Sequence, residues 1–223
     1  MIILFWGAFA KMACWALCVA MDAIRTRERW RSRLPHWEVE GRWHFVTIRC
    51  HGSLPREVRL RLYEIHQSLA AIEAHAEAFR QLQRRYFLIT EKYLDGGGGL
   101  AVFNQARPCA LCIGALLAME REGWWVGEAT VMPNHVHLLI RRQASDYSLR
   151  EILQRFKGRS ARWVNQELKR TGRLWQQDWF DRWMRNEAEL RKTIAYIRNN
   201  PVKARIVDQW QAYPWRISSE LEL

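Results

Sequence analysis

The stretch WWVGEATVMPNHVHLLIRR, residues 124–142, decides the fold. Its two halves, Trp124 to Val131 and His135 to Arg141, are rich in aromatic and β-branched residues, which favour strands. Met132-Pro133-Asn134 separates them, and proline and asparagine are typical of tight turns. The stretch therefore predicts a β-hairpin.

Strand-like and helix-like segments alternate on both sides of this hairpin. Residues 43–49 and 86–90 have the composition of short strands. The spacing of apolar residues predicts helices over 56–85, 108–119, 148–170 and 186–199. Pro201 is expected to end the last helix, and a Trp-rich loop with Trp175, Trp179 and Trp183 precedes it. A tight hairpin among helices predicts an α+β fold, with helices packed on a small antiparallel sheet.

The composition indicates a globular protein with a polyanionic partner. Of 223 residues, 49% are hydrophobic and 26% charged, which excludes a disordered chain. Lys and Arg number 35 and Asp and Glu 23, so the net charge is +12, which favours nucleic acid. Five cysteines without regular spacing argue against a disulfide framework and for a reducing, cytoplasmic location.

The N-terminal segment 1–21 is apolar apart from Lys11, and a basic run follows it. About 20 apolar residues can span a bilayer, so a membrane anchor is one interpretation. An apolar helix docked on the domain and translated sequence upstream of the true start are the others, and we favour these two. We therefore expect an extension over 1–30 and a single domain over 31–223, and a membrane partner is disfavoured but left open by residues 1–21.

His135 and His137 are the sharpest chemical signal. Side chains alternate along a strand, so both imidazoles point to one face and Val136, Leu138 and Ile140 to the other. Two imidazoles side by side can clamp a metal ion, although a lone His-x-His is more often structural. Cys109-x-x-Cys112 could in principle complete a zinc site with them, but both cysteines fall in an apolar helix, where cysteine commonly packs as a small hydrophobe.

The last predicted helix carries a second signal. Leu190, Ile194 and Ile197 form one apolar stripe, and Tyr196 lies roughly 120° from its centre. Tyr196 and Asn200 are four residues apart and share a face. A tyrosine hydroxyl can act as a nucleophile, and an Asn oxygen could complete the shell of Mg²⁺ or Mn²⁺. Taken alone, Tyr196 is better interpreted as an aromatic packed at the rim, against Trp183 or a neighbour.

Together these motifs resemble the REP-associated tyrosine transposases, which are single-tyrosine HUH transposases. The matching stretches run in consistent order over about 35–219, and include VMPNHVHLLI (131–140), FKGRSARWVNQ (156–166) and YIRNNPVKARIV (196–207). EKYLDGG (91–97) also matches. The resemblance implies a ferredoxin-like or RRM-like antiparallel sheet with His-x-His on a central strand.

The resemblance also implies an activity. Such enzymes nick and rejoin single-stranded DNA near palindromic hairpins, through a 5′-phosphotyrosine and a free 3′-OH. Carried over to this chain, Tyr196 is the nucleophile, and His135, His137 and Asn200 hold a divalent metal, Mg²⁺ or Mn²⁺, with Asn199 as a second choice. A transient phosphotyrosine conserves bond energy, so no nucleotide cofactor is expected. The protein is expected to be a monomer or a homodimer.

Residues 141–173 contain ten basic and three acidic residues, more than half of the chain's excess charge. Such a stripe suits backbone phosphates. The predicted contacts to single-stranded or hairpin DNA are Lys157, Arg159, Arg162, Arg173 and Lys203. Two other hypotheses remain: a non-catalytic nucleic-acid-binding protein with the same fold, and a membrane-tethered enzyme.

Overall fold

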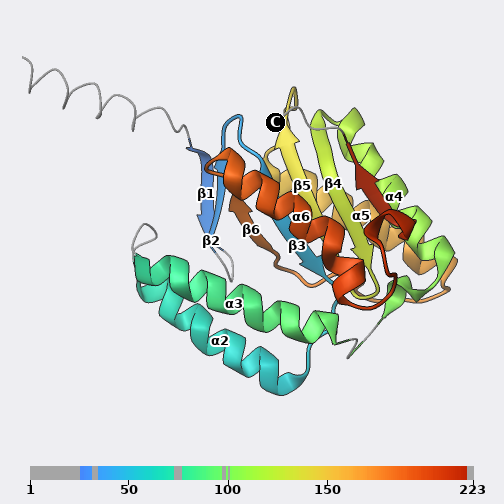
Figure 1. Ribbon diagram of the computed structural model, residues 1–223, viewed down its shortest axis with the longest axis horizontal. Coiled ribbons are helices and arrows are strands. Elements are labelled where there is room, and N and C mark those ends of the chain that lie inside the picture. Colours follow the sequence, from blue (N-terminus) through green and yellow to red (C-terminus); the bar gives the residue numbers. More distant parts are fainter. Residues whose placement is uncertain (1–25, 32–34, 73–76, 97–98, 100, 220–223) are drawn as a thin grey trace, which may run out of the picture.

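The computed structural model describes residues 26–31, 35–72, 77–96, 99 and 101–219 (Figure 1). The apolar segment 1–21 lies outside the described residues. The strands are β1 (Thr26–Arg31), β2 (Pro35–Val39), β3 (His44–Arg49), β4 (Trp124–Met132), β5 (His135–Arg142), β6 (Phe180–Trp183) and β7 (Arg216–Ser218). The helices are α2 (Arg56–Ala71), α3 (Glu77–Asp95), α4 (Ala106–Arg121), α5 (Leu149–Glu167) and α6 (Glu187–Lys203), with 3-10 turns η1 (Val102–Asn104) and η2 (Trp210–Ala212).

One sheet of five strands organises the molecule. Its order is β6-β3-β5-β4-β7, and every neighbouring pair is antiparallel. With α4 before β4 and α5 after β5, the strands β3, β4, β5 and β6 have the order of the β-α-β-β-α-β, ferredoxin-like motif. The predicted α+β class is therefore confirmed, and the histidine strand β5 is central.

The hairpin forms where the sequence predicts it. Strands β4 and β5 pair from Trp124↔Arg142 to Met132↔His135, so Pro133 and Asn134 make the turn. Pro133 has no N–H to donate, and it sits outside the ladder where none is needed.

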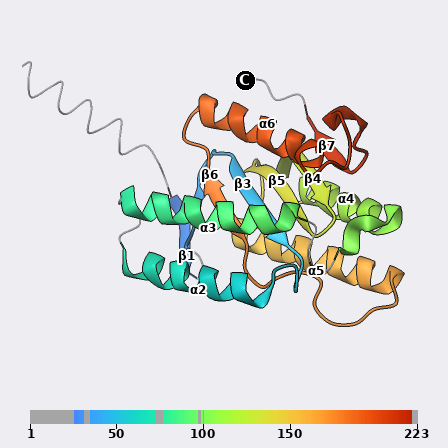
Figure 2. The ribbon, with the colours of Figure 1, turned by 60° about the horizontal axis from the view of Figure 1, so that its bottom comes forward.

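Helices cover both faces of the sheet. On one face α4 and α5 pack on Val46, Val136, Leu138 and Ile140 in the main apolar core. On the other face α3 and α6 enclose Phe45 and Leu139, with α2 packed outside α3. Figure 2 shows α6 and α5 on opposite sides of the strands. Because side chains alternate along β5, the histidines belong to the α3–α6 face, as predicted.

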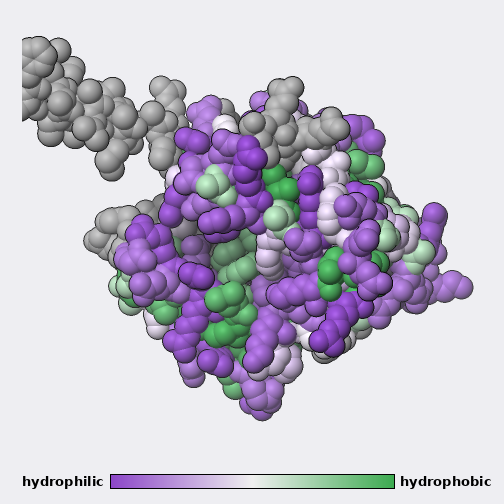
Figure 3. All heavy atoms as spheres, viewed as in Figure 1, coloured by the Kyte–Doolittle hydropathy of each residue, from purple (hydrophilic) through white to green (hydrophobic). Residues whose placement is uncertain are grey.

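The face in Figure 3 is mostly hydrophilic, with apolar side chains gathered in small groups. Among the described residues, no helix combines the length and the apolar character that a bilayer crossing requires.

The predicted strand over 86–90 is wrong, and the predicted helix over 56–85 is two helices. Residues 86–90 lie inside α3, which packs along α2. Phe87 in this segment contacts Phe45 of β3 and Phe180 of β6, with ring centroids 5.7 and 4.8 Å apart. Burial of an amphipathic helical face thus overrides the local β propensity of Tyr86-Phe87-Leu88-Ile89-Thr90.

The last helix does not end at Pro201. It continues to Lys203, with Pro201 inside it. Proline cannot donate to the Ile197 carbonyl one turn earlier, and the Thr130 hydroxyl of β4 donates to that carbonyl instead, at 3.2 Å. A neighbouring strand therefore satisfies the acceptor that the proline leaves open.

The predicted Trp-rich loop contains a strand. Phe180–Trp183 forms β6 on β3, and Trp175 bridges Cys50. Trp175 and Trp179 are buried in the main core, so most of these tryptophans pack, as expected.

Candidate active site

The two histidines of β5 face each other in the interior. Both are fully buried, and their Nε2 atoms lie 3.0 Å apart. Adjacent ligands of one six-coordinate Mg²⁺, at about 2.1 Å from the ion, would be separated by about this distance. Burial, and then the neighbouring His137, lower the pKa of His135 to about 3, so its ring is neutral and keeps a lone pair.

The other ring nitrogens are held by polar neighbours. His135 Nδ1 lies 2.7 Å from Asn134 Oδ1, which can only accept, so this nitrogen carries the proton. His137 Nδ1 lies 2.9 Å from the Thr47 hydroxyl of β3, its partner in the sheet register. With both Nδ1 atoms engaged by outer partners, the two Nε2 atoms are left facing each other, an arrangement found in many protein metal sites.

Glu91 of α3 completes the cluster, and the sequence analysis missed it. Its carboxylate Oε2 lies 3.3 Å from His137 Nε2. Glu91, His135 and His137 are all buried, and their ligand atoms lie within 4.8 Å of one another. Glu91 does lie in EKYLDGG (91–97), one of the stretches that resemble the transposase family. Because a strand was predicted over 86–90, Glu91 was not expected to lie on a helix that faces the histidines.

Glu91 is a carboxylate in this setting. Burial alone would raise its pKa, but the charge and hydrogen bond of His137, then His135 and the Tyr196 hydroxyl, outweigh it and lower the pKa to about 2. Its second oxygen, Oε1, is buried without a hydrogen-bond partner among the described residues.

Tyr196 of α6 reaches the same cluster. Its hydroxyl donates a hydrogen bond to Glu91 Oε2, and its ring centroid is 5.3 Å from that of His137. Burial, and then the negative Glu91, raise the pKa of this phenol well above its usual value, so the hydroxyl keeps its proton. The structure thus brings the predicted tyrosine and both predicted histidines together.

Asn200 lies one turn after Tyr196 and is almost fully buried. Its Nδ2 donates to the Tyr196 carbonyl at 3.0 Å, whereas its Oδ1 has no hydrogen-bond partner among the described residues. A buried, unsatisfied amide oxygen is costly unless something binds it. Asn199, the second choice, is exposed on another side of α6.

The predicted DNA contacts fall into two groups. Arg162 and Arg173, near and beyond the end of α5, are exposed. Lys157, Arg159 and Lys203 have internal partners: the Gln177 carbonyl, Glu122 and Asp95, each at 2.6 Å. Lys203 also lies on α6, across the sheet from the other four.

The zinc interpretation of Cys109 and Cys112 finds no support. Both cysteines lie in the core between α4 and the sheet, the face opposite the histidines. Cys109 Sγ donates to the Phe103 carbonyl, and burial raises its pKa to about 12, which disfavours the thiolate that zinc needs.

Comparison with known proteins finds a family that resembles part of the chain. Residues 117–200, which include the hairpin, α5 and Tyr196, match the family model described as "Transposase IS200 like". The matched segment, less than half of the chain, is similar to the IS200-like transposases. The match agrees with the family resemblance inferred from the sequence.

The IS200-like segment contains His135, His137, Tyr196 and Asn200, whereas Glu91 precedes it. A solved structure of a REP-associated tyrosine transposase bound to a REP hairpin is similar to this chain, with 16% identity and a TM-score of 0.49. The alignment covers 83% of this chain and 82% of that one. No curated protein matches the chain.

Proposed function

We propose that this protein is an IS200-like transposase that nicks and rejoins single-stranded DNA at palindromic hairpins, with Tyr196 as the nucleophile. The observation that carries the proposal is the convergence of His135 Nε2, His137 Nε2 and the Glu91 carboxylate beside the Tyr196 hydroxyl. A binding module needs no such buried cluster, because DNA affinity comes from surface cations.

The cluster fits a divalent cation. His135, His137 and Glu91 would hold it, and the unsatisfied Asn200 Oδ1 is a fourth candidate ligand. Two nitrogen ligands with one or two oxygens suit Mn²⁺ or Mg²⁺, and a bound ion would offset the charge that develops on the scissile phosphate.

The residues of the chain supply the nucleophile and its positioning. The Tyr196 oxygen attacks phosphorus, and the bond from phosphorus to the 3′ oxygen breaks. The 5′ phosphate stays on Tyr196, and the other fragment leaves with a 3′-OH after its oxygen gains a proton. The phenol proton has an acceptor at hand in Glu91 Oε2, to which it is already hydrogen-bonded. Rejoining is the same exchange run backwards, so no nucleotide is consumed.

The exchange gives a direct test. The full chain is incubated with labelled single-stranded imperfect hairpins and Mg²⁺ or Mn²⁺, and a covalent protein–DNA band is sought under denaturing conditions. We expect a band that chelator and Tyr196→Phe both abolish. Tyr93→Phe, an exposed tyrosine of α3, is the matched control and should keep the band.

The alternative makes a different prediction. If the wild-type chain binds hairpins but gives no covalent band with either metal, a non-catalytic DNA-binding protein is favoured. If Tyr196→Phe keeps the band, Tyr196 is not the nucleophile.

A further inference from the structure

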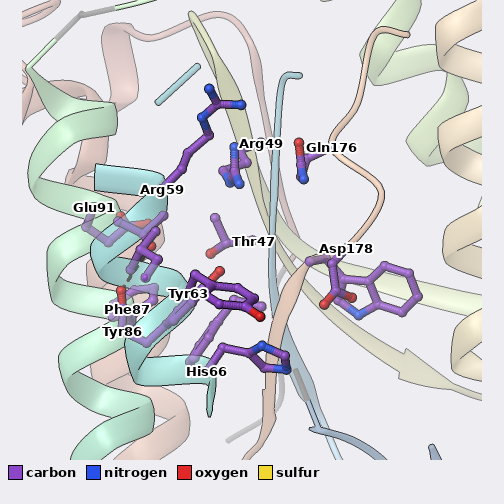
Figure 4. Close-up of a pocket in the computed structure, with 14 residues that line it drawn as sticks. Thr47, Arg49, Arg59, Tyr63, His66, Tyr86, Phe87, Glu91, Gln176 and Asp178 are labelled. Atoms are coloured by element: carbon purple, nitrogen blue, oxygen red, sulfur yellow. Dashed lines mark hydrogen bonds between the residues drawn. The ribbon is translucent and has the colours of Figure 1, made fainter. Parts of the chain in front are cut away.

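A pocket reaches from the surface to the edge of the site just described, where it is lined by Thr47 and Glu91. Its walls are formed by α2, α3, β3 and the segment 176–180. Figure 4 shows Arg49 and Arg59 toward one end, with Tyr63 and His66 further along. A molecule that fills the pocket therefore lies next to the histidine partner Thr47 and the tyrosine partner Glu91.

Helix α2 supplies the outer part of the pocket from one face. Arg59, Tyr63 and His66 are spaced i, i+4 and i+7, so they project on the same side of the helix. Tyr63 is 59% exposed, so much of its ring is open to solvent. A second hollow, lined by Arg56, Arg59, Leu60, Tyr63 and His66, continues outward over this face.

The deeper walls are flat and aromatic. Phe87 and Phe180 line the pocket and contact each other, with ring centroids 4.8 Å apart. Tyr63 and His66 form a second pair nearer the surface, with centroids 6.2 Å apart. Rings of this kind accept a nucleobase by stacking, and they do so only when the base is unpaired.

The charges of the pocket suit a phosphate at its outer end. The two carboxylates are engaged with other groups: Asp178 contacts His36 at 3.0 Å, and Glu91 contacts His137 and Tyr196. Within the described part of the chain, no carboxylate forms an ion pair with Arg59, which is exposed. An exposed guanidinium next to stacking rings is the pattern that single-stranded DNA sites use.

We infer that this pocket binds one unpaired nucleotide of the DNA strand that continues from the scissile phosphate. Its base stacks on Tyr63, and Arg59 contacts the adjoining phosphate. The outer hollow over α2 guides the strand away from the site. The inference rests on the proposed function for the identity of the strand, and it adds a subsite formed by α2, which lies outside the IS200-like segment.

The test measures binding without cleavage. The full chain is titrated with a fluorescein-labelled oligothymidylate in the presence of chelator, and affinity is followed by anisotropy. Tyr63→Ala should weaken binding on the order of tenfold, and Tyr63→Phe should retain it because the ring remains. Arg59→Ala should weaken binding and lower the slope of log affinity against log salt by about 0.7.

Two matched variants serve as controls. Arg61→Ala changes an exposed arginine of α2 outside the pocket, and Tyr93→Ala changes an exposed tyrosine of α3. Both should bind like the wild type. A blunt duplex, whose bases are paired, should be bound equally by Tyr63→Ala and by the wild type.

Two results would overturn the inference: Tyr63→Ala and Arg59→Ala binding the oligonucleotide as tightly as the controls, or Tyr63→Ala weakening duplex binding to the same extent. Neither result would touch the proposed function, which is decided by the covalent band and Tyr196→Phe. Conversely, a chain without a covalent band could still show the Tyr63 effect.

Discussion

The Tyr196 hydroxyl of α6 donates a hydrogen bond to the Glu91 carboxylate of α3, although 105 positions separate them in the chain. The same Glu91 oxygen lies 3.3 Å from His137 Nε2. One carboxylate thus connects the proposed nucleophile to the proposed metal ligands. Lys203 of α6 also pairs with Asp95 of α3, which is a second polar contact between the two helices.

Glu91→Gln keeps the shape of the side chain and removes its charge. We expect Mn²⁺ affinity, measured by isothermal titration calorimetry, to fall at least about tenfold, the lower end of what outer partners alone contribute. The pKa of Tyr196 should also fall, because the negative charge that helps to raise it is gone. Covalent capture of DNA should be reduced because the metal site is weakened.

The control is Glu77→Gln, an exposed glutamate in the first turn of the same helix. It should bind Mn²⁺ like the wild type. Equal Mn²⁺ affinities in Glu91→Gln and Glu77→Gln would remove Glu91 from the metal site.

Thr47→Val tests the role of the hydroxyl that contacts His137 Nδ1. Valine suits a strand and is close to threonine in volume, so we expect the fold to be retained, at a cost of about 1–2 kcal/mol for the lost buried hydrogen bond. Loss of this outer partner should lower Mn²⁺ affinity by about 10- to 100-fold. The measurement is again calorimetric titration of the full chain.

Thr130→Val is the matched control, since Thr130 flanks His137 from the other neighbouring strand. Its hydroxyl donates a hydrogen bond to the Ile197 carbonyl, which has no helical N–H donor because residue 201 is proline. The free energy of unfolding in urea should therefore fall by about 1–2 kcal/mol, with Mn²⁺ affinity unchanged. If Thr130→Val lowers Mn²⁺ affinity as much as Thr47→Val does, Thr47 has no specific positioning role.

The parts of the site that were predictable are local in the chain. Strand alternation places His135 and His137 on one face, and helical spacing places Tyr196 beside Asn200, so short-range geometry is enough. Glu91 joins them only through tertiary packing of α3. Its helix was obscured because Tyr86-Phe87-Leu88-Ile89-Thr90 has β-like composition, and only the burial of Phe87 against Phe45 and Phe180 decides for a helix.

For the fold, too, the features set by neighbouring residues could be predicted, and those set by distant contacts could not. The hairpin specifies an antiparallel sheet, and its turn residues are local signals. The edge strand β6 was missed because Phe180–Trp183 has only four residues, and its pairing with β3 depends on distant contacts. The continuation of α6 beyond Pro201 was not predicted, because the hydroxyl that replaces the missing N–H donor belongs to Thr130 on the distant strand β4.

His36 makes stability depend on pH. It is fully buried between Asp178 and Asp181; burial by itself would lower its pKa, but the two carboxylates outweigh it and raise the pKa from 6.5 to about 9. The raised value means that this stabilisation is fully present below pH 6.5 and is lost as pH rises through about 9. The change corresponds to at most about 3 kcal/mol.

The contribution of His36 to the free energy of unfolding is measured by urea unfolding of the wild type and of His36→Gln, at several pH values between 6 and about 9.5. The difference in unfolding free energy should shrink as the pH rises. A difference that is constant over this range would show that His36 does not bind the proton.

Arg162 and Arg173 are expected to carry the DNA affinity of the α5 region, because both are exposed. Each alanine substitution should weaken hairpin binding and lower the salt slope by about 0.9 for duplex contacts. Arg159→Ala is the matched comparison: Arg159 pairs with Glu122 at 2.6 Å, so its loss should reduce stability more than binding. Anisotropy titrations over a salt series measure the slopes, and thermal unfolding measures stability. A larger slope change for Arg159→Ala than for Arg162→Ala would mean that Arg159 leaves Glu122 to contact DNA.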